Sequence, residues 1–248
     1  MVEMDILPKF ASTVILYRLK DRIDDLFKSK FEIFLIQRSK EMKFLGGVHA
    51  FPGGKLEQDD FSEKNLVKCK GLNKDQAYKL ILDEKTYHKN KDYSLGFWIA
   101  GIREVFEEIG ILFAYNKALN LLNLSNPKYK QKFENYREKL LRDEILFSDI
   151  VDKEELYLAT DKLYYFRHFI TPEISPIRYD TRFFLAELPP NQPIKPDTNE
   201  IISYEWTNPA EAIKQYRKKE IILIPPQYSC LLSLQRVIDI KEFCNLLS

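Results

Sequence analysis

Three glutamates within one short segment, residues 103–111, restrict most strongly what this chain can become. In a helix, Glu104, Glu107 and Glu108 stand at positions i, i+3 and i+4, so their carboxylates share one face. Like charges at this spacing repel by roughly 0.2–0.5 kcal/mol per pair. Gly110 predicts a helix end, which adds the negative end of the helix dipole. A positive partner is therefore expected, and hard divalent cations such as Mg²⁺ prefer carboxylate oxygens.

The alternative is an acidic helix face that only water covers. Apolar side chains on the other side of the same segment argue against it, because they predict a helix packed on a core. Arg103 stands four residues before Glu107, within reach of the carboxylates. We therefore expect the acidic face to be held in place by the fold. The apolar residues are Ile102, Val105, Ile109 and Ile111.

Together with Gly54 and Asp60, residues 103–111 resemble the Nudix box. The family pattern is Gly, five residues, Glu, seven residues, then Arg-Glu-aliphatic-any-Glu-Glu-any-Gly-aliphatic. The second half matches at every specified position, whereas the first half differs twice. Asp60 stands where the family has Glu, and residues 61–102 occupy the seven-residue gap. One Nudix subfamily, which includes a peroxisomal coenzyme A diphosphatase, carries such an insertion and the same Asp.

A second resemblance lies before the box. Family members that cleave coenzyme A carry a signature of Arg-Ser, an arginine, a glycine and Phe-Pro-Gly-Gly at fixed spacings. Arg38, Ser39, Lys43, Gly47 and residues 51–54 fall at those spacings. The lysine keeps the positive charge of the arginine it replaces but loses the bidentate fork. The alternative is a basic strand end followed by a glycine turn.

The resemblance implies hydrolysis of a diphosphate that joins a nucleoside to another group. It implies Mg²⁺ or Mn²⁺ held by the box glutamates, with Arg103 orienting them and Glu104 taking the proton of the attacking water. The expected metal ligands are Glu104, Glu107, Glu108 and the carbonyl of Gly53, with Glu200 as a further candidate carboxylate. The expected substrate-binding residues are Arg38, Lys43, Gly54 and Arg178, and the last has a salt bridge to Asp180 or a surface role as its alternative.

Coenzyme A or an acyl derivative is the preferred substrate, cut to 3′,5′-ADP and a phosphopantetheine. The signature at residues 38–54 favours it. The first alternative is a pyrophosphatase for NADH, ADP-ribose or another nucleotide derivative. The second is a catalytically silent nucleotide-binding regulatory protein, which the intact glutamate set disfavours.

Composition narrows the partners. With 38 basic and 37 acidic residues the net charge is +1. The chain therefore has no strong positive field that would predict binding to nucleic acid or to an acidic membrane surface. No apolar run is long enough to span a bilayer, and acidic residues stand where a signal peptide would be apolar. Three cysteines without a Cys-x-x-Cys pair fit a reducing compartment without structural zinc. We expect a soluble cytoplasmic protein; a homodimer is left open.

Alternating and β-branched segments predict strands, and capping residues predict helices between them. With the box helix they predict an α/β fold, the Nudix α/β/α sandwich around a mixed β-sheet, as a single domain over residues 1–248. Ser94 is expected to cap the box helix. Insertions are expected at about residues 61–95, with one or two short helices, and as a helical segment at about 116–163, either a cap over the cleft or a dimer surface. The expected strands are 10–19, 31–37, 164–171, 181–188 and 200–206, and the expected helices are 126–145, 148–158, one from Asn208 and a last one ending at 247.

Overall fold

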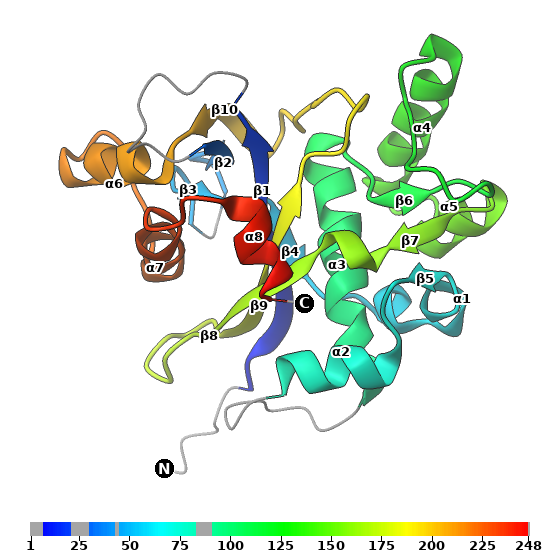
Figure 1. Ribbon diagram of the computed structural model, residues 1–248, viewed down its shortest axis with the longest axis horizontal. Coiled ribbons are helices and arrows are strands. Elements are labelled where there is room, and N and C mark those ends of the chain that lie inside the picture. Colours follow the sequence, from blue (N-terminus) through cyan, green and yellow to red (C-terminus); the bar gives the residue numbers. More distant parts are fainter. Residues whose placement is uncertain (1–6, 21–29, 43–44, 83–90, 248) are drawn as a thin grey trace.

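A mixed β-sheet forms the centre of the molecule (Figure 1). The structure, a computed structural model, describes residues 7–20, 30–42, 45–82 and 91–247. The strand order is β10-β2-β1-β9-β8; β1 and β9 run parallel, and the other pairs along this path are antiparallel. Two short strands complete the sheet, β3 (His49–Ala50) beside β2 and β4 (Gly53–Lys55) beside β1. The long strands are β1 (Lys9–Leu19), β2 (Phe31–Arg38), β8 (Tyr164–Ile170), β9 (Tyr179–Glu187) and β10 (Ile201–Thr207).

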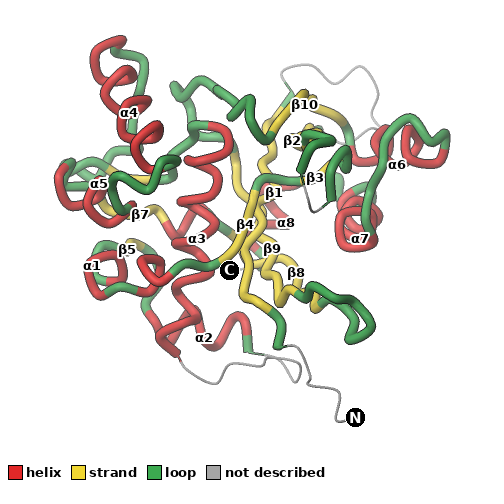
Figure 2. The backbone as a smooth tube through the Cα atoms, turned by 180° about the vertical axis from the view of Figure 1, so that it is seen from behind, coloured by secondary structure: helices red, strands yellow, loops and turns green. Residues whose placement is uncertain are grey.

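Helices cover both faces of this sheet, as Figure 2 shows from behind. Successive residues of a strand point to opposite faces, so β1 sends Val14 and Leu16 towards one core and Ile15 and Tyr17 towards the other. The first core contains α3 (Lys91–Ile109), and the second contains the three C-terminal helices. The predicted α/β/α sandwich around a mixed sheet is therefore confirmed. The C-terminal helices are α6 (Pro209–Arg217), α7 (Pro225–Leu234) and α8 (Ile240–Asn245).

The box helix α3 is longer at its start than the sequence suggested. Ser94 is fully buried inside the helix, so its predicted capping role is wrong. The physical reason is the packing of α3 on α2 (Lys74–Ile81), to which Lys91 adds an ion pair with Asp75 at 2.7 Å. At its other end α3 stops at Ile109, because Gly110 takes a φ of 76°, a conformation that glycine adopts without strain.

The two insertions contact each other. Short helices predicted after residue 61 are present, but β5 pairs with β7 of the second insertion in a three-stranded sheet, β5-β7-β6, that the sequence did not predict. Residues 83–90 lie outside the described part. The elements within and beside the two insertions are η1 (Gln58–Phe61), α1 (Glu63–Leu66), β5 (Cys69–Lys70), α2, β6 (Ala114–Tyr115), α4 (Pro127–Leu140), α5 (Phe147–Lys153), β7 (Tyr157–Ala159) and η2 (Thr160–Lys162).

Three predicted helix ends were wrong. Helix α4 stops at Leu140 because the chain reverses at Asp143, whose φ is 56°. Helix α5 ends at Lys153, and the following residues form β7 after a second positive φ of 49° at Glu155. The last predicted helix is two helices, because Asp239 caps a new one, α8, with its side chain. Among the described residues no helix combines the length and apolar character needed to cross a membrane. The cytoplasmic location and the single domain stay predictions.

Candidate functional site

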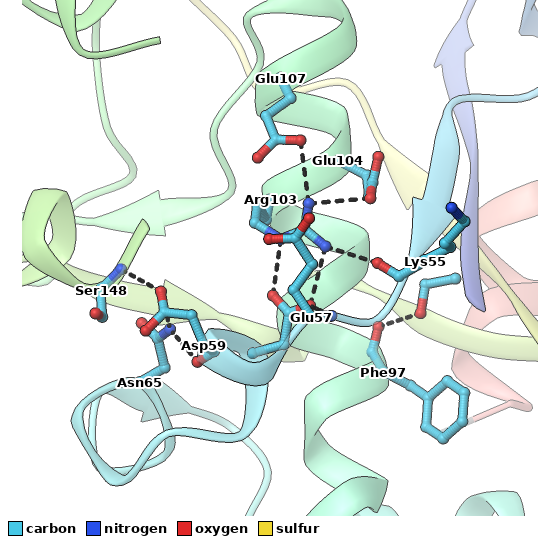
Figure 3. Close-up of polar contacts among 11 residues, drawn as sticks. Lys55, Glu57, Asp59, Asn65, Phe97, Arg103, Glu104, Glu107 and Ser148 are labelled. Carbon is cyan, nitrogen blue, oxygen red and sulfur yellow. Dashed lines mark hydrogen bonds and ion pairs between the residues drawn. The ribbon is translucent and has the colours of Figure 1, made fainter. Parts of the chain in front are cut away.

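Arg103 joins the two halves of the box (Figure 3). Its side chain is only 2% exposed. Nε and Nη2 each donate a hydrogen bond of 2.9 Å to the carboxylate of Asp60, and Nη2 also donates to the Lys55 carbonyl at 2.7 Å. Nη1 donates to Glu104 Oε1 and to Glu107 Oε2, both at 3.0 Å. One guanidinium therefore positions two box glutamates against residues that precede the insertion.

Asp60 anchors this arrangement from the other side. Its side chain is fully buried, and its Oδ2 also accepts a hydrogen bond of 2.7 Å from the backbone of Glu57 in a capping box. Its neighbour Asp59 accepts a hydrogen bond of 2.8 Å from the Ser148 backbone at the start of α5. The sequence reasoning missed this second contact, because no local signal relates residue 59 to residue 148.

Glu108 contacts two residues of the coenzyme A signature, Gly53 of β4 and Arg38 of β2. Its Oε2 accepts a hydrogen bond of 3.1 Å from the Gly53 backbone, and its Oε1 lies 3.9 Å from Arg38 Nη1. The Nε of Arg38 is buried, and within the described part of the chain it has no hydrogen-bond acceptor. Glu200 lies near enough for its charge to act on Glu108. Arg38 and Gly53 therefore meet at Glu108 near the end of α3, within range of the Glu200 charge.

The two glycines of β4 make the close approach of strand and helix possible. A β-carbon on Gly54 would lie 2.5 Å from the carboxylate of Glu104. A β-carbon on Gly53, whose φ is 155°, would lie 2.2 Å from the Ser12 carbonyl oxygen of β1. The backbone of β1 excludes a side chain at Gly53, and a side chain at Gly54 would displace the Glu104 carboxylate, so β4 brings its backbone directly beside the carboxylates.

Burial dominates the electrostatics of the glutamates. It raises the pKa of Glu104 to about 8, an effect that the Arg103 charge only partly offsets. It raises the pKa of Glu107 to about 7 in the same way. The pKa of Glu108 is also well above its ordinary value, because of burial and then the charge of Glu104. Without a bound cation, the ionised forms of these three carboxylates are therefore poorly stabilised, although Arg103 and Arg38 lie beside them.

The residues fit a divalent cation. Within the described residues, no three Asp, Glu, His or Cys side chains converge as a ready-made cage, since Arg103 takes one oxygen each of Glu104 and Glu107. The carboxylates still provide hard oxygen donors, which suit Mg²⁺ and Mn²⁺. The contact of Gly54 with Glu104 leaves no room for a side chain between strand and helix. The raised pKa values give a physical reason for a cation to bind there.

These pKa values predict a pH dependence of stability in the absence of metal. The folded protein binds protons at Glu104 and Glu107 more tightly than the unfolded chain, whose glutamates titrate near 4.5. Their contribution is complete below that value and is lost as the pH rises through 7 and 8. We expect the free energy of unfolding, from urea titrations in a chelator, to fall between about pH 5 and about pH 8, by up to about 1.4 kcal/mol per pH unit and proton.

Glu104→Gln should flatten this slope, whereas Glu211→Gln on the exposed face of α6 should not change it. A stability that stays constant or increases over the same range would contradict the burial of charged carboxylates in the site.

Two predicted substrate contacts, Arg178 and Lys43, have no described contact with the box glutamates. Arg178 is 5% exposed at the start of β9, where its Nε donates to the Thr171 carbonyl at 3.1 Å. No described contact links it to the box glutamates, and its substrate role stays a prediction. Arg182 forms an ion pair with Asp180, which also lies 2.7 Å from His168 Nε2. Lys43 lies outside the described residues.

Comparisons with known proteins show which family this chain resembles in sequence. Residues 9–234 match the family model described as NUDT19 Nudix domain. The chain is 27% identical over 237 residues to acyl-coenzyme A diphosphatase NUDT19 of Xenopus laevis, covering 86% of this chain and 62% of that protein. It is 26% identical over 239 residues to the protein of the same name of Homo sapiens, covering 86% of this chain and 64% of that protein. The chain thus spans less than two thirds of these relatives.

A solved structure shares the fold. It is a NUDIX hydrolase from Alicyclobacillus acidocaldarius, with a TM-score of 0.71, 20% sequence identity and coverage of 97% of both chains. At this identity the likeness concerns the arrangement of helices and strands alone. It extends over both insertions as well as the central sheet, because nearly the whole chain is covered.

Proposed function

This chain belongs to the NUDT19 Nudix domain family, and we propose that it hydrolyses the diphosphate bond of coenzyme A or an acyl-coenzyme A in a metal-dependent reaction. The products would be 3′,5′-ADP and a phosphopantetheine or its acyl derivative. The observation that carries the proposal is the pair of largely buried glutamates, Glu104 and Glu107, that Arg103 joins beside β4. The relatives named acyl-coenzyme A diphosphatase support this substrate class.

The proposed reaction needs its negative charges balanced. A divalent cation, Mg²⁺ or Mn²⁺, would neutralise the diphosphate and activate water when bound at Glu104, Glu107, Glu108 and the Gly53 carbonyl. Arg103 holds Oε1 of Glu104 and Oε2 of Glu107, which fixes both side chains. We assign to Oε2 of Glu104 the removal of the proton from the attacking water. Arg103 bonds the other oxygen, Oε1, and a positioned carboxylate is a common general base.

Arg38 is proposed to bind the substrate's phosphates. It is the signature arginine at the end of β2, and its buried Nε has no acceptor among the described residues. A turn positions it: its backbone N–H donates to the Val48 carbonyl at 3.0 Å, and Gly47 donates to the Arg38 carbonyl at 3.1 Å. The spacing of the signature is thus matched by a closed turn in the fold, and a guanidinium is well suited to a phosphate.

The test is a substrate panel of coenzyme A, acetyl-coenzyme A, NADH and ADP-ribose, with Mg²⁺ or Mn²⁺ and with a chelator. We expect cleavage of the two coenzyme A compounds to depend on metal, with 3′,5′-ADP detected by chromatography. Arg38→Met should raise the KM for coenzyme A about tenfold or more, because a charge-assisted bond to phosphate is lost. Arg142→Met is the matched control, since that side chain is 67% exposed on the insertion.

Other outcomes separate the alternatives. Cleavage of ADP-ribose or NADH with coenzyme A untouched would keep the diphosphatase and overturn the substrate proposal. No metal-dependent turnover on any of these compounds, with nucleotide binding retained, would favour a silent regulatory protein. A homodimer and a cytoplasmic location stay predictions; so does the absence of nucleic-acid and membrane partners.

A further inference from the structure

The end of α3 that carries Glu107 and Glu108 is held from outside the helix. The last carbonyls of a helix have no partner within it. Here Asp197 N–H donates to the Glu108 carbonyl at 2.8 Å, and Lys195 N–H donates to the Ile109 carbonyl at 2.9 Å. The segment just before β10 therefore closes the helix end, where the acidic side chains stand.

Arg137 of α4 completes this closure. Arg137 is buried, with only 6% of its surface exposed. Its Nε donates to the Glu107 carbonyl at 2.7 Å, and its Nη1 donates to the Lys195 carbonyl at 2.6 Å. In Figure 1, α4 and the yellow segment before β10 both lie at the upper end of α3. One guanidinium thus fastens the insertion to the helix and to the segment that covers it.

Glu107 is consequently fixed by two arginines. Arg103 bonds its carboxylate at 3.0 Å, and Arg137 bonds its main-chain carbonyl at 2.7 Å. We propose that Arg137 is a positioning residue for the glutamates of α3, which sets where Glu107 and Glu108 present their oxygens to a divalent cation. The inference rests on the proposed function, because it concerns the same metal-binding carboxylates. It gives the helical insertion a role in the site.

The two roles that Arg137 could have, as a positive charge or as a positioning group, predict opposite effects of its removal on cation affinity. If Arg137 acted only as a positive charge near a cation, its removal would tighten cation binding. If it positions the helix end, its removal takes a hydrogen-bond donor from the Glu107 and Lys195 carbonyls and should weaken cation binding. Groups that orient metal ligands typically change metal affinity by about tenfold or more when they are removed.

The experiment measures Mn²⁺ binding to the full chain by titration calorimetry, independently of activity. We expect Arg137→Met to weaken binding about tenfold. Arg137→Lys should fall between Met and wild type, because one ammonium keeps the charge but cannot reach both carbonyls as the fork does. Phe133→Leu is the control, since Phe133 packs on Phe106 of α3 from the same helix without bonding a carbonyl. The Mn²⁺ affinity of Phe133→Leu should stay within about twofold of wild type, even if its melting temperature falls as much as that of Arg137→Met.

Wild-type affinity or tighter binding in a folded Arg137→Met variant would overturn the inference. So would equal weakening in Phe133→Leu at a matched loss of melting temperature. If Arg137→Met does not fold, Arg137→Lys decides the question, and wild-type affinity in that variant counts against the proposal. Failure of the proposed function is recognised separately, because wild type then binds no Mn²⁺ or Glu107→Gln binds it as wild type does.

Discussion

Replacing Glu107 with glutamine is expected to lower metal-dependent hydrolysis by at least about a hundredfold, the usual scale for removing one charged group that acts on the transition state. The amide has the same shape and its oxygen still accepts from Arg103 Nη1, so the 3.0 Å contact can persist. What is lost is the negative charge that a cation needs. The measurement is the rate of 3′,5′-ADP release from coenzyme A at saturating Mg²⁺.

Glu211→Gln makes the same chemical change on α6, across the sheet from the site, and should leave the rate unchanged. The dependence of the rate on metal concentration gives a second test of Glu107 as a ligand. If Glu107 is a ligand, higher Mn²⁺ concentrations should restore part of the activity of Glu107→Gln. A rate close to wild type in Glu107→Gln at every metal concentration would remove this residue from the proposed site.

The second large effect concerns stability. Arg103→Met is expected to lower the free energy of unfolding by about 3–5 kcal/mol, because a fully buried Asp60 carboxylate loses its partner. The variant should also lose activity, since Glu104 and Glu107 lose the group that fixes them. Urea unfolding in the presence of a chelator measures the first effect without a contribution from bound metal.

A double variant tests the cause. Asp60→Asn keeps an acceptor for the Glu57 N–H but removes the buried charge, so Arg103→Met with Asp60→Asn should be more stable than Arg103→Met alone. The coupling free energy should be at least about 1 kcal/mol. Arg18→Met is the surface control: Arg18 donates twice to Glu32, at 2.9 and 2.7 Å, but is 46% exposed. Its loss should cost at most about 1 kcal/mol. Strictly additive effects at residues 60 and 103 would show that the pair does not act as proposed.

Local patterns in the sequence predicted the elements that carry the site. The period of the apolar residues and the stop at Gly110 predicted the end of α3 and the shared face of its glutamates. β-Branched and aromatic residues predicted β1, and alternation predicted β2, both nearly to the residue. Asn126 and Asn208 predicted the starts of α4 and α6 through their side-chain caps. These features depend on neighbours within a few positions, which is why a single sequence suffices for them.

What the sequence by itself determined is therefore the fold class, the family and the residues of the box. Tertiary structure alone decided the partners that lie far apart in the chain: Asp60 on Arg103, Ser148 on Asp59, and Arg137 on the carbonyl of Glu107. It also decided that the two insertions share a small sheet. The physical reason is that such contacts depend on how separate elements pack, whereas their spacing along the chain, interrupted by two insertions, carries no period or cap that a local rule can detect.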